Sequence, residues 1–394
     1  MKKKFWFAIL AVIMVLPLAF ALTACDKGDN PPDNGDGGED ELVPTKGIKY
    51  EVTEDGAGFC VTGIESIEIT ELVIPSTYLN KPVVAIAKNA FSNCVLLESI
   101  VIPDSVVSIG ENAFKNTAYY ENLSNWRWKV LYIGKHLIKA QEDIAEGYWV
   151  NDGTITIADS AFWFCEHLTS VTIPDSVVTV GSGAFGYCTA LKSATIGNGV
   201  KTIGYSAFIN CNALGSVDMG DSVVTIGQYA FQECAKLKSI ELPATLKTMG
   251  YGAFKNCNSL SDVYLHDIGA WCNVDFRDAT ANPLDYANNL YLNGVLVTEI
   301  VIPDGVTVIG NYAFNRLTTL TKVTIPKSVT KLGRQAFSYC TSLTEIYYTG
   351  GIWDFYHVDK TNNGYDTAWN YKIGKNIVYC TDGYYYDYVY YPYN

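Results

Sequence analysis

The sequence is poor in the residues from which catalytic and metal centres are usually built. It has only four histidines among 394 residues, and its eleven cysteines include no C-x-x-C pair. It also lacks the H-E-x-x-H, G-x-S-x-G, phosphate-loop and dinucleotide-binding signatures. These absences argue against a zinc protein, a serine hydrolase and a nucleotide-dependent enzyme. We therefore expect a protein without enzymatic activity, cofactor or structural metal.

Positive charge is also scarce. The chain carries 28 Lys and Arg against 41 Asp and Glu, which gives a net charge of −13. Such a surface repels nucleic acid and anionic lipid headgroups, so neither is expected to bind the folded part. Basic ligands or divalent cations are the partners that this charge attracts.

The N-terminus has the features of an export signal. Three lysines follow Met1, and an apolar run extends from Phe5 to Leu22, as in secretory signal peptides. The next residues, Leu22-Thr23-Ala24-Cys25, resemble a bacterial lipobox, which implies that residues 1–24 are removed and Cys25 is lipidated. The alternative is an uncleaved helical anchor, since the run is about long enough to span a membrane. Both interpretations place the remaining chain outside the cytoplasmic membrane.

Residues 25–46 read as a flexible acidic linker behind the lipid. They consist mainly of Asp, Gly, Asn, Pro and Glu, and such a segment cannot bury enough apolar surface to fold. Removal of residues 1–24 takes away three lysines and no acid, so the net charge of the mature chain falls from −13 to −16.

A fixed internal period dominates the rest of the chain. Five phenylalanines lie 23 residues apart, and each follows an alanine and precedes a cysteine by three residues. A period of this size is typical of a solenoid, in which each coil buries its apolar face only against its neighbours. The phenylalanines are Phe162, Phe185, Phe208, Phe231 and Phe254.

The best-formed unit, residues 161–183, predicts what each part of a coil does. Apolar and polar residues alternate through Val171–Ile173 as in a strand, and Pro174 ends that strand because it cannot donate to a ladder. Val177 and Val180, three residues apart, suit a turn of loose helix on the opposite side. We therefore expect a right-handed coil with one parallel β-sheet face and an irregular or short-helical opposite face.

These motifs resemble the BspA-type, or treponemal-type, leucine-rich repeats of bacterial surface lipoproteins. The resemblance covers about residues 47–350 and rests on nine Ala-Phe units. Where the period breaks, we expect inserts at about 117–155 and 266–298. The Tyr-rich segment 351–394 is expected to cap the last coil. Members of this family are exported proteins proposed to adhere to host matrix proteins or to other cells.

Seven cysteines share the same place in the repeat. Neighbouring coils bring like positions to about 5 Å, close to the Cα separation of a disulfide. Five successive coils carry one cysteine each, however, so complete pairing is impossible. We expect a ladder of buried thiols, with partial disulfide bonding as the alternative. The seven are Cys94, Cys165, Cys188, Cys211, Cys234, Cys257 and Cys340.

Strand residues between the buried ones face outward and form the candidate ligand-binding surface. Three of them are acidic and fall on successive strands, about 5–7 Å apart if they are in register. A solvated acidic face is the expected outcome, and a weak calcium site at Asp218, Glu241 and Asp262 is the alternative. Glycosidase chemistry is not expected, because a flat sheet offers no pocket to raise the pKa of one carboxyl. The candidates are Ser170, Thr172, Ser193, Thr195, Asp218, Glu241, Asp262 and Tyr264.

Aromatic residues in the inserts form a second candidate surface. Trp126 and Trp128 lie in the first insert and Trp271 lies in the second. Exposed Trp and Tyr are common anchors of protein interfaces, although inserts also need aromatic residues for a small core of their own. The sequence thus predicts a surface lipoprotein that binds a protein ligand. A glycan-binding accessory protein and a purely structural envelope component remain as alternatives.

Overall fold

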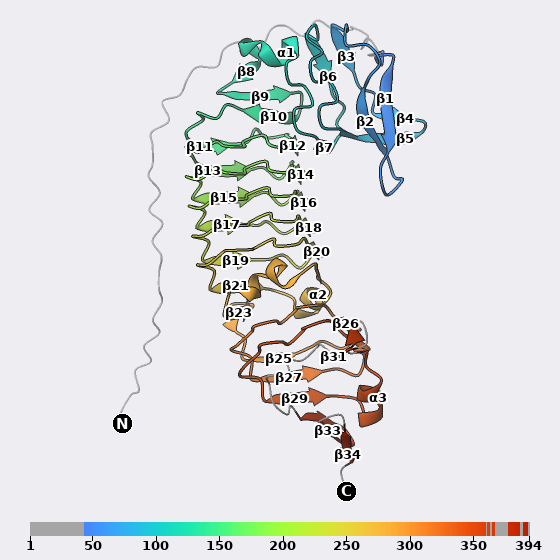
Figure 1. The fold of residues 1–394 in the computed structure, drawn as a ribbon, viewed down its shortest axis with the longest axis vertical. Helices are drawn as coiled ribbons and strands as arrows, with labels where there is room; N and C mark the ends of the chain where they lie inside the picture. The colour runs from blue at the N-terminus through green and yellow to red at the C-terminus, as the bar shows by residue number, and fades with distance from the viewer. Residues whose placement is uncertain (1–42, 360, 363–364, 367–376, 387–388, 393–394) are drawn as a thin grey trace, which may run out of the picture. The chain divides into compact units, whose positions relative to one another are not determined.

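The repeat closes into a coil that is stacked about 13 times in the computed structural model (Figure 1). The structure describes residues 43–359, 361–362, 365–366, 377–386 and 389–392. The predicted leucine-rich-repeat solenoid is confirmed. The predicted signal peptide, the lipid-bearing Cys25 and most of the linker lie outside the described residues. Within the described part of the chain, no helix is long and apolar enough to cross a membrane.

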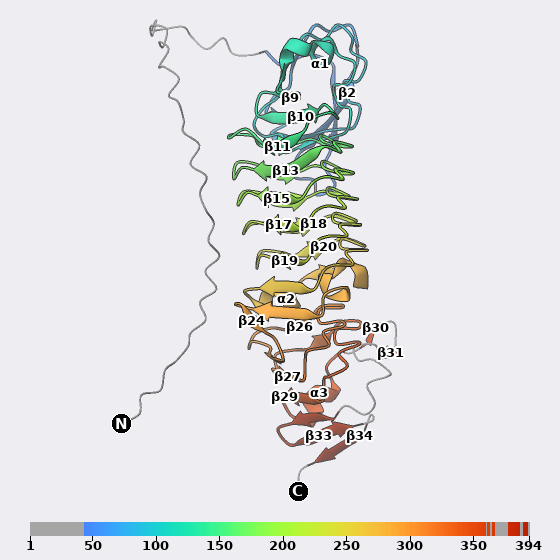
Figure 2. The same cartoon turned by 90° about the vertical axis from the view of Figure 1, so that its left-hand side faces the viewer.

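One side of the solenoid is a series of parallel ladders, here called the front sheet, and Figure 2 views it face on. Each main strand pairs with the equivalent strand one coil away, so most registers repeat with the 23-residue period. The parallel strands are β11 (Glu146–Trp149), β13 (Leu168–Ile173), β15 (Ser193–Ile196), β17 (Ser216–Asp218), β19 (Ser239–Glu241), β21 (Asp262–Leu265), β23 (Asn289–Leu292), β25 (Glu299–Val301), β27 (Lys322–Ile325) and β29 (Glu345–Tyr348). The short strand β24 (Val295–Leu296) pairs antiparallel with β23.

The other side carries a second ladder, the back sheet, built mostly from two-residue strands. Val180 lies in one of them, so the loose helical turn expected at Val177 and Val180 is wrong. Thr179 and Val180 instead pair with the coils on both sides. The strands are β8 (Trp126–Arg127), β9 (Val130–Ile133), β10 (His136–Ala140), β12 (Thr156–Ile157), β14 (Thr179–Val180), β16 (Thr202–Ile203), β18 (Thr225–Ile226), β20 (Thr248–Met249), β22 (Asp275–Phe276), β26 (Val308–Ile309) and β28 (Lys331–Leu332).

Close approach of neighbouring coils explains the glycine that follows six of these short strands, β14, β16, β18, β20, β26 and β28. A Cβ added to Gly181 would lie 2.6 Å from the carbonyl carbon of Ala158 in the preceding coil. A larger residue at this position would push the two coils apart.

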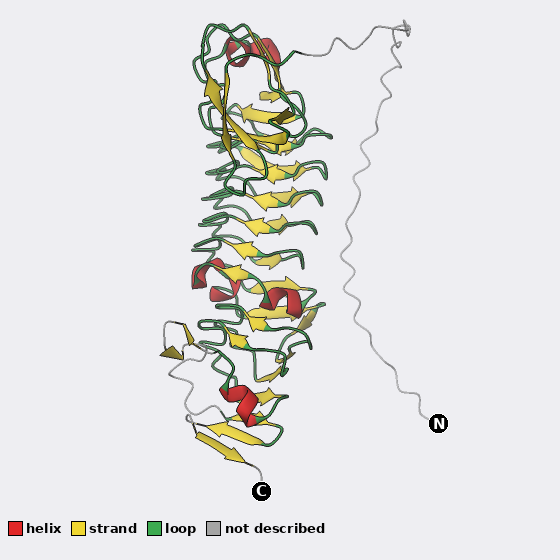
Figure 3. Cartoon of the chain, turned by 90° about the vertical axis from the view of Figure 1, so that its right-hand side faces the viewer, coloured by secondary structure: helices red, strands yellow, loops and turns green. Residues whose placement is uncertain are grey.

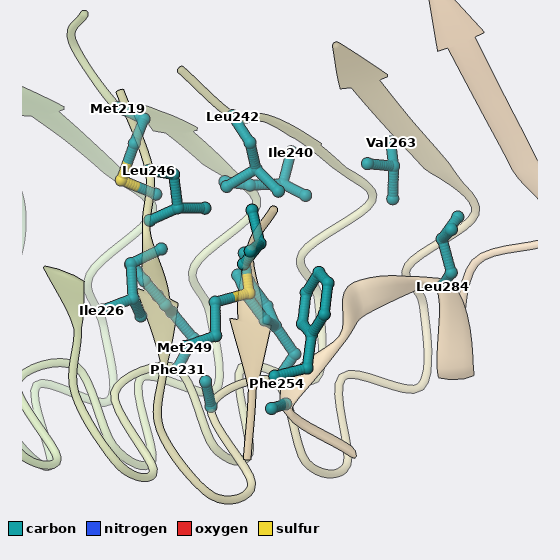
Figure 4. Packing of buried hydrophobic residues seen from close by; sticks show 14 of the residues in the cluster. Met219, Ile226, Phe231, Ile240, Leu242, Leu246, Met249, Phe254, Val263 and Leu284 are labelled. Atoms are coloured by element: carbon teal, nitrogen blue, oxygen red, sulfur yellow. The ribbon is translucent and has the colours of Figure 1, made fainter. Parts of the chain in front are cut away.

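The Ala-Phe turns form the third side and supply the core. Each phenylalanine of the main array is fully buried, and its ring stacks on the next at 4.9 to 5.3 Å between centroids. Figure 4 shows Phe231 and Phe254 beneath the side chains of the two sheets. All ten cysteines in the described residues are free thiols, which confirms the predicted thiol ladder.

The N-terminal coils have a hydrophobic cluster of their own. An antiparallel hairpin, β1 (Ile48–Val52) with β2 (Phe59–Ile64), begins this part of the chain. Its second strand then pairs in parallel with a strand of the first coil. The remaining strands are β3 (Glu71–Val73), β4 (Thr77–Tyr78), β5 (Lys81–Ile86), β6 (Ser99–Val101) and β7 (Ser108–Ile109).

Both segments that lack an Ala-Phe pair contribute coils to the solenoid. The first supplies β10 and β11, and the second supplies β22 and β23. Short helices, red in Figure 3, lie within both segments. They are α1 (Ala118–Glu121) and η1 (Leu123–Asn125) in the first, and α2 (Ile268–Cys272), η2 (Ala279–Ala281) and η3 (Pro283–Asp285) in the second.

The C-terminal segment extends the front sheet beyond β29. Helix α3 (Ile352–Tyr356) follows the last coil, and β32 (Val378–Cys380) then pairs in parallel with β29. Two antiparallel strands, β33 (Gly383–Tyr386) and β34 (Val389–Pro392), continue the ladder. A separate small hairpin joins β30 (Thr361–Asn362) to β31 (Tyr365–Asp366).

Candidate functional site

One row of outward-facing side chains runs across seven strands of the front sheet, and we call it the outer row. The strand register places these residues side by side from β11 to β17 and again from β19 to β23. Their neighbours in each strand, such as Val171 and Val217, point into the core. The outer row consists of Trp149, Thr172, Thr195, Asp218, Glu241, Tyr264 and Tyr291.

The chemistry of the outer row changes along its length. Trp149 at one end is 71% exposed, two threonines follow, and two exposed carboxylates occupy the centre. At the other end, the rings of Tyr264 and Tyr291 stack with centroids 4.8 Å apart. The row therefore offers an acidic centre between two aromatic ends.

The remaining predicted residues of this face belong to a parallel inner row. Ser170 and Ser193 are paired in the ladder, and Asp262 lies in this row because it pairs with Ser239 rather than with Glu241. Asp262 accepts hydrogen bonds from Ser261 Oγ at 2.6 Å and from Asn289 Nδ2 at 2.9 Å.

This register separates the three carboxylates that suggested calcium. Asp218 and Glu241 share the outer row. Asp262 lies in the inner row, two residues before Tyr264 in β21, and its carboxylate already accepts two hydrogen bonds. Among the described residues, no group of three or more His, Cys, Asp or Glu side chains is placed to hold a metal ion. The geometry gives the calcium alternative no support.

Glu241 has a cationic partner that the spacing of the repeat does not suggest. His266, just beyond β21, places Nε2 2.5 Å from Glu241 Oε1, and its Nδ1 lies 3.2 Å from Asn293 Oδ1. The pKa of His266 is raised above its usual value, mainly by the hydrogen bond with Glu241 and to a smaller extent by that with Asn293. The charge at the centre of the outer row therefore depends on pH.

Two adjoining depressions hollow the edge of the front sheet where its strands end. Their volumes are about 580 and 380 Å³, and both are lined by Thr195, Asp218 and Asp221. Together they form what we call the acidic groove. Five carboxylates and no Lys or Arg line it: Asp152, Asp175, Asp218, Asp221 and Glu241.

Three of these acids come from a row of loops at the corner of the coil. Asp175 Oδ1 accepts a hydrogen bond from the backbone N–H of Asn198 at 2.6 Å, and Asn198 Oδ1 accepts one from the N–H of Asp221 at 3.0 Å. Asp152 precedes Asp175 by the same 23 residues. These links between coils hold the loops, and with them the carboxylates, in line.

Sequence reasoning missed Trp149, Asp152, Asp175 and Asp221 as members of this surface. The 23-residue period nevertheless contains the signal, because Trp149 precedes Thr172 by one period, and the three acids fall on another such series through Asn198. The absence of an Ala-Phe pair before β11 concealed that Trp149 belongs to a regular strand.

The structure does not bring the predicted aromatic inserts together. Trp128 is 90% exposed at a hairpin turn, whereas Trp126 is half-buried and donates its indole N–H to Tyr120 O at 2.8 Å. Trp271 is 2% exposed, and its indole N–H donates to Ala313 O at 2.8 Å. Burial therefore removes Trp271 from the candidate binding surface and makes it part of the core.

A comparison with protein families agrees with this architecture. The chain matches the family model described as BspA type Leucine rich repeat region in six copies, over residues 64–145, 155–273 and 287–356. No curated protein matches it. A leucine-rich repeat protein from Bacteroides ovatus is 23% identical over 79% of this chain and 85% of its own, with a TM-score of 0.36. A leucine rich cell surface protein from Faecalibacterium prausnitzii is 22% identical over 82% and 98%, with a TM-score of 0.26.

Proposed function

Because the chain belongs to the BspA-type leucine-rich repeat family, we propose that it is a cell-surface binding protein without enzymatic activity. Its acidic groove and outer row hold a protein ligand during adhesion to host matrix or to other cells. Leucine-rich-repeat proteins of the bacterial surface are generally scaffolds for protein interactions. A lipid on Cys25 and the linker 25–46 tether the solenoid to the membrane from which it is displayed.

The acidic groove is the observation that carries this proposal. Five carboxylates and no Lys or Arg line it, with His266 as the one titratable base beside Glu241, so its potential attracts a ligand segment that presents Lys or Arg. Exposed charges of this kind act mainly on the rate and selectivity of association, and salt screens them over about 8–10 Å. Binding through the groove is therefore expected to weaken as the salt concentration rises.

The aromatic ends of the outer row supply the second element of a protein interface. Trp and Tyr contribute disproportionately to binding where they are desolvated by a partner. Exposed Trp149 and the stacked pair of Tyr264 and Tyr291 flank the acidic centre. The row covers six steps between strands, or about 29 Å, so an extended segment of a ligand can contact both ends at once.

The test is binding of fibronectin, fibrinogen and collagen to the immobilised full chain in a detergent that contains no sugar. Binding is measured by surface plasmon resonance at pH 7 between 50 and 500 mM salt. The double variant Asp218→Asn, Glu241→Gln removes two charges from the groove. Glu54→Gln, Glu166→Gln removes two exposed charges that do not line it.

Salt-sensitive binding that is lost only in the groove variant supports the proposal. Equal loss in both variants indicates an effect of net charge alone. Absence of binding to all three proteins, with both variants folded, contradicts adhesion to host matrix and favours a structural role in the envelope.

A further inference from the structure

A larger cleft lies on the C-terminal coils, outside the acidic groove. Its volume is about 760 Å³, within the range of small-molecule sites. Two corner loops, a tyrosine of β29 and one face of helix α3 line it. The side chains that matter are those of Asp304, Lys327, Ser328, Trp353, Asp354 and His357.

Helix α3 holds a tryptophan at the wall of this cleft. Ile352 and Phe355 are buried and anchor the helix, so Trp353 lies on the outward face and is 65% exposed. The ring of His357 lies 4.4 Å from the indole at an interplanar angle of 59°. The ring of Tyr356 also lies near the indole, with centroids 6.1 Å apart and an interplanar angle of 23°. The indole is therefore supported by two neighbouring rings while most of its surface remains open.

The histidine beside this ring is oriented by a backbone hydrogen bond. His357 Nδ1 lies 2.8 Å from Trp353 O. Because a carbonyl oxygen only accepts, Nδ1 donates, and in the neutral ring Nε2 is left as an acceptor. The wall of the cleft thus combines an apolar ring face with an acceptor at its edge.

The polar groups of the cleft have both signs of charge. Asp304 and Asp354 supply carboxylates, Lys327 supplies an ammonium group, and all three side chains are exposed. Asp354 Oδ2 accepts the N–H of Gly351 at 3.2 Å, and Ser328 Oγ accepts the N–H of Gly305 at 3.1 Å. The hydroxyl of Ser328 can still donate, and Asp354 can still accept through its other oxygen.

This composition points to a different ligand from that of the acidic groove. Lys327 repels a purely cationic ligand, and Asp304 and Asp354 repel a purely anionic one. A neutral ring with hydroxyls at its edge can hydrogen-bond with the donors and acceptors of the cleft. The C–H groups on its face can pack on the indole at the same time. We propose that the cleft binds a hexopyranose unit of a glycan, stacked on Trp353 and hydrogen-bonded by Asp354, Lys327 and Ser328.

The experiment is titration of the full chain, in a zwitterionic detergent, with four hexasaccharides: β-1,4-glucose, β-1,3-glucose, α-1,6-mannose and β-1,4-N-acetylglucosamine. Isothermal titration calorimetry measures binding to the wild type and to two single variants. Trp353→Ala removes the platform in the cleft. Trp128→Ala removes an exposed tryptophan at a hairpin turn outside the cleft.

The expected result is saturable binding of at least one hexasaccharide, weakened ten-fold or more by Trp353→Ala and unchanged by Trp128→Ala. Asp354→Asn should weaken the same interaction several-fold. An indole ¹H–¹⁵N spectrum of the wild type, assigned with Trp353→Phe, should show the largest shift for Trp353 when the sugar is added. This measurement uses the wild type, so it tests the proposal even if Trp353→Ala folds poorly.

Three results overturn the proposal: no binding by any of the four sugars, binding that both tryptophan variants retain, or preference of the cleft for an arginine-rich peptide over all four. Because Asp218→Asn, Glu241→Gln leaves this cleft intact, failure of the groove and failure of the cleft are distinguishable.

Discussion

The thiol of Cys211 donates a hydrogen bond to the carbonyl oxygen of Phe185, 3.1 Å away in the preceding coil. The same contact recurs from Cys188 to Phe162, from Cys234 to Phe208 and from Cys257 to Phe231, at 3.1 to 3.3 Å. Each of these four cysteines thus links its coil to the previous one without a covalent bond. The ladder joins the core positions of the repeat to the backbone of the Ala-Phe turns.

Native thiols of the ladder are predicted to resist alkylation. Burial raises the pKa of Cys211 and of Cys257 to about 12, and the thiolate is the reactive form. Iodoacetamide at pH 8, followed by peptide mass spectrometry, should modify half-buried Cys60 first and the ladder only after unfolding in urea. Rapid modification of Cys211 in the native chain would contradict the ladder.

Phe208→Ala is predicted to destabilise the solenoid by roughly 3–5 kcal/mol, because it leaves a cavity in a well-packed core. Phe208 is fully buried between Phe185 and Phe231, at 5.1 and 5.3 Å. The matched control is Phe164→Ala, at an exposed position two coils earlier, with an expected cost of about 1 kcal/mol or less. Urea unfolding followed by circular dichroism compares the two, and equal losses would argue against the stacked core.

Gln335→Asn is predicted to stabilise the chain by up to about 1 kcal/mol. Gln335 has φ of 52°, a left-handed conformation that Asn tolerates better than other non-glycine residues. Two earlier coils place Asn89 and Asn112 at the equivalent position, also with positive φ. Gln228→Asn changes a residue outside the positive-φ set and should give no gain. A higher melting temperature for both variants would point to a general effect of Asn.

Stability is predicted to fall between about pH 6.5 and pH 4 because of His136. Its ring is fully buried, and neither nitrogen has a hydrogen-bond partner. Burial lowers its pKa from 6.5 to about 4. Below pH 6.5 the unfolded chain takes up a proton that the folded chain does not, so the folded state loses stability, by roughly 2–3 kcal/mol at pH 4.5.

The measurement is the difference in unfolding free energy between pH 7 and pH 4.5. It is compared for the wild type, His136→Leu and the exposed control His167→Leu. His136→Leu should reduce this pH dependence and His167→Leu should not. If the unfolding free energies of the wild type and of His136→Leu change equally between pH 7 and pH 4.5, His136 is not the source of the pH dependence.

Cationic probes are predicted to bind the acidic groove more tightly at pH 8 than at pH 6. His266 is protonated at low pH, and its pKa is raised by the hydrogen bonds with Glu241 and Asn293. As pH rises through that pKa, the groove loses a positive charge, so a hexa-arginine peptide should gain affinity a few-fold. His266→Gln should abolish the gain and His167→Gln should preserve it, as fluorescence anisotropy can show.

Much of the binding surface could be predicted from the period because it repeats. A residue and its equivalent 23 positions later meet in adjacent strands, so Thr172, Thr195 and Asp218 fall in line without knowledge of the rest of the molecule. The same rule reaches Trp149 and Asp175. Their place in the surface was available from the sequence, although the fragmentary repeat before β13 hid it.

The sequence by itself determined the coil, its stacked phenylalanines and its buried thiols, because these contacts depend only on identical units meeting one period apart. Where the period breaks, only the tertiary structure decided which side chains are buried and which line the surface. Trp271, in the second of the segments that lack an Ala-Phe pair, lies in the core, where Ala313 O accepts its indole N–H. The cleft around Trp353 depends on how α3 packs beside two corner loops. Burial there is set by contacts between non-equivalent segments, which no local spacing encodes.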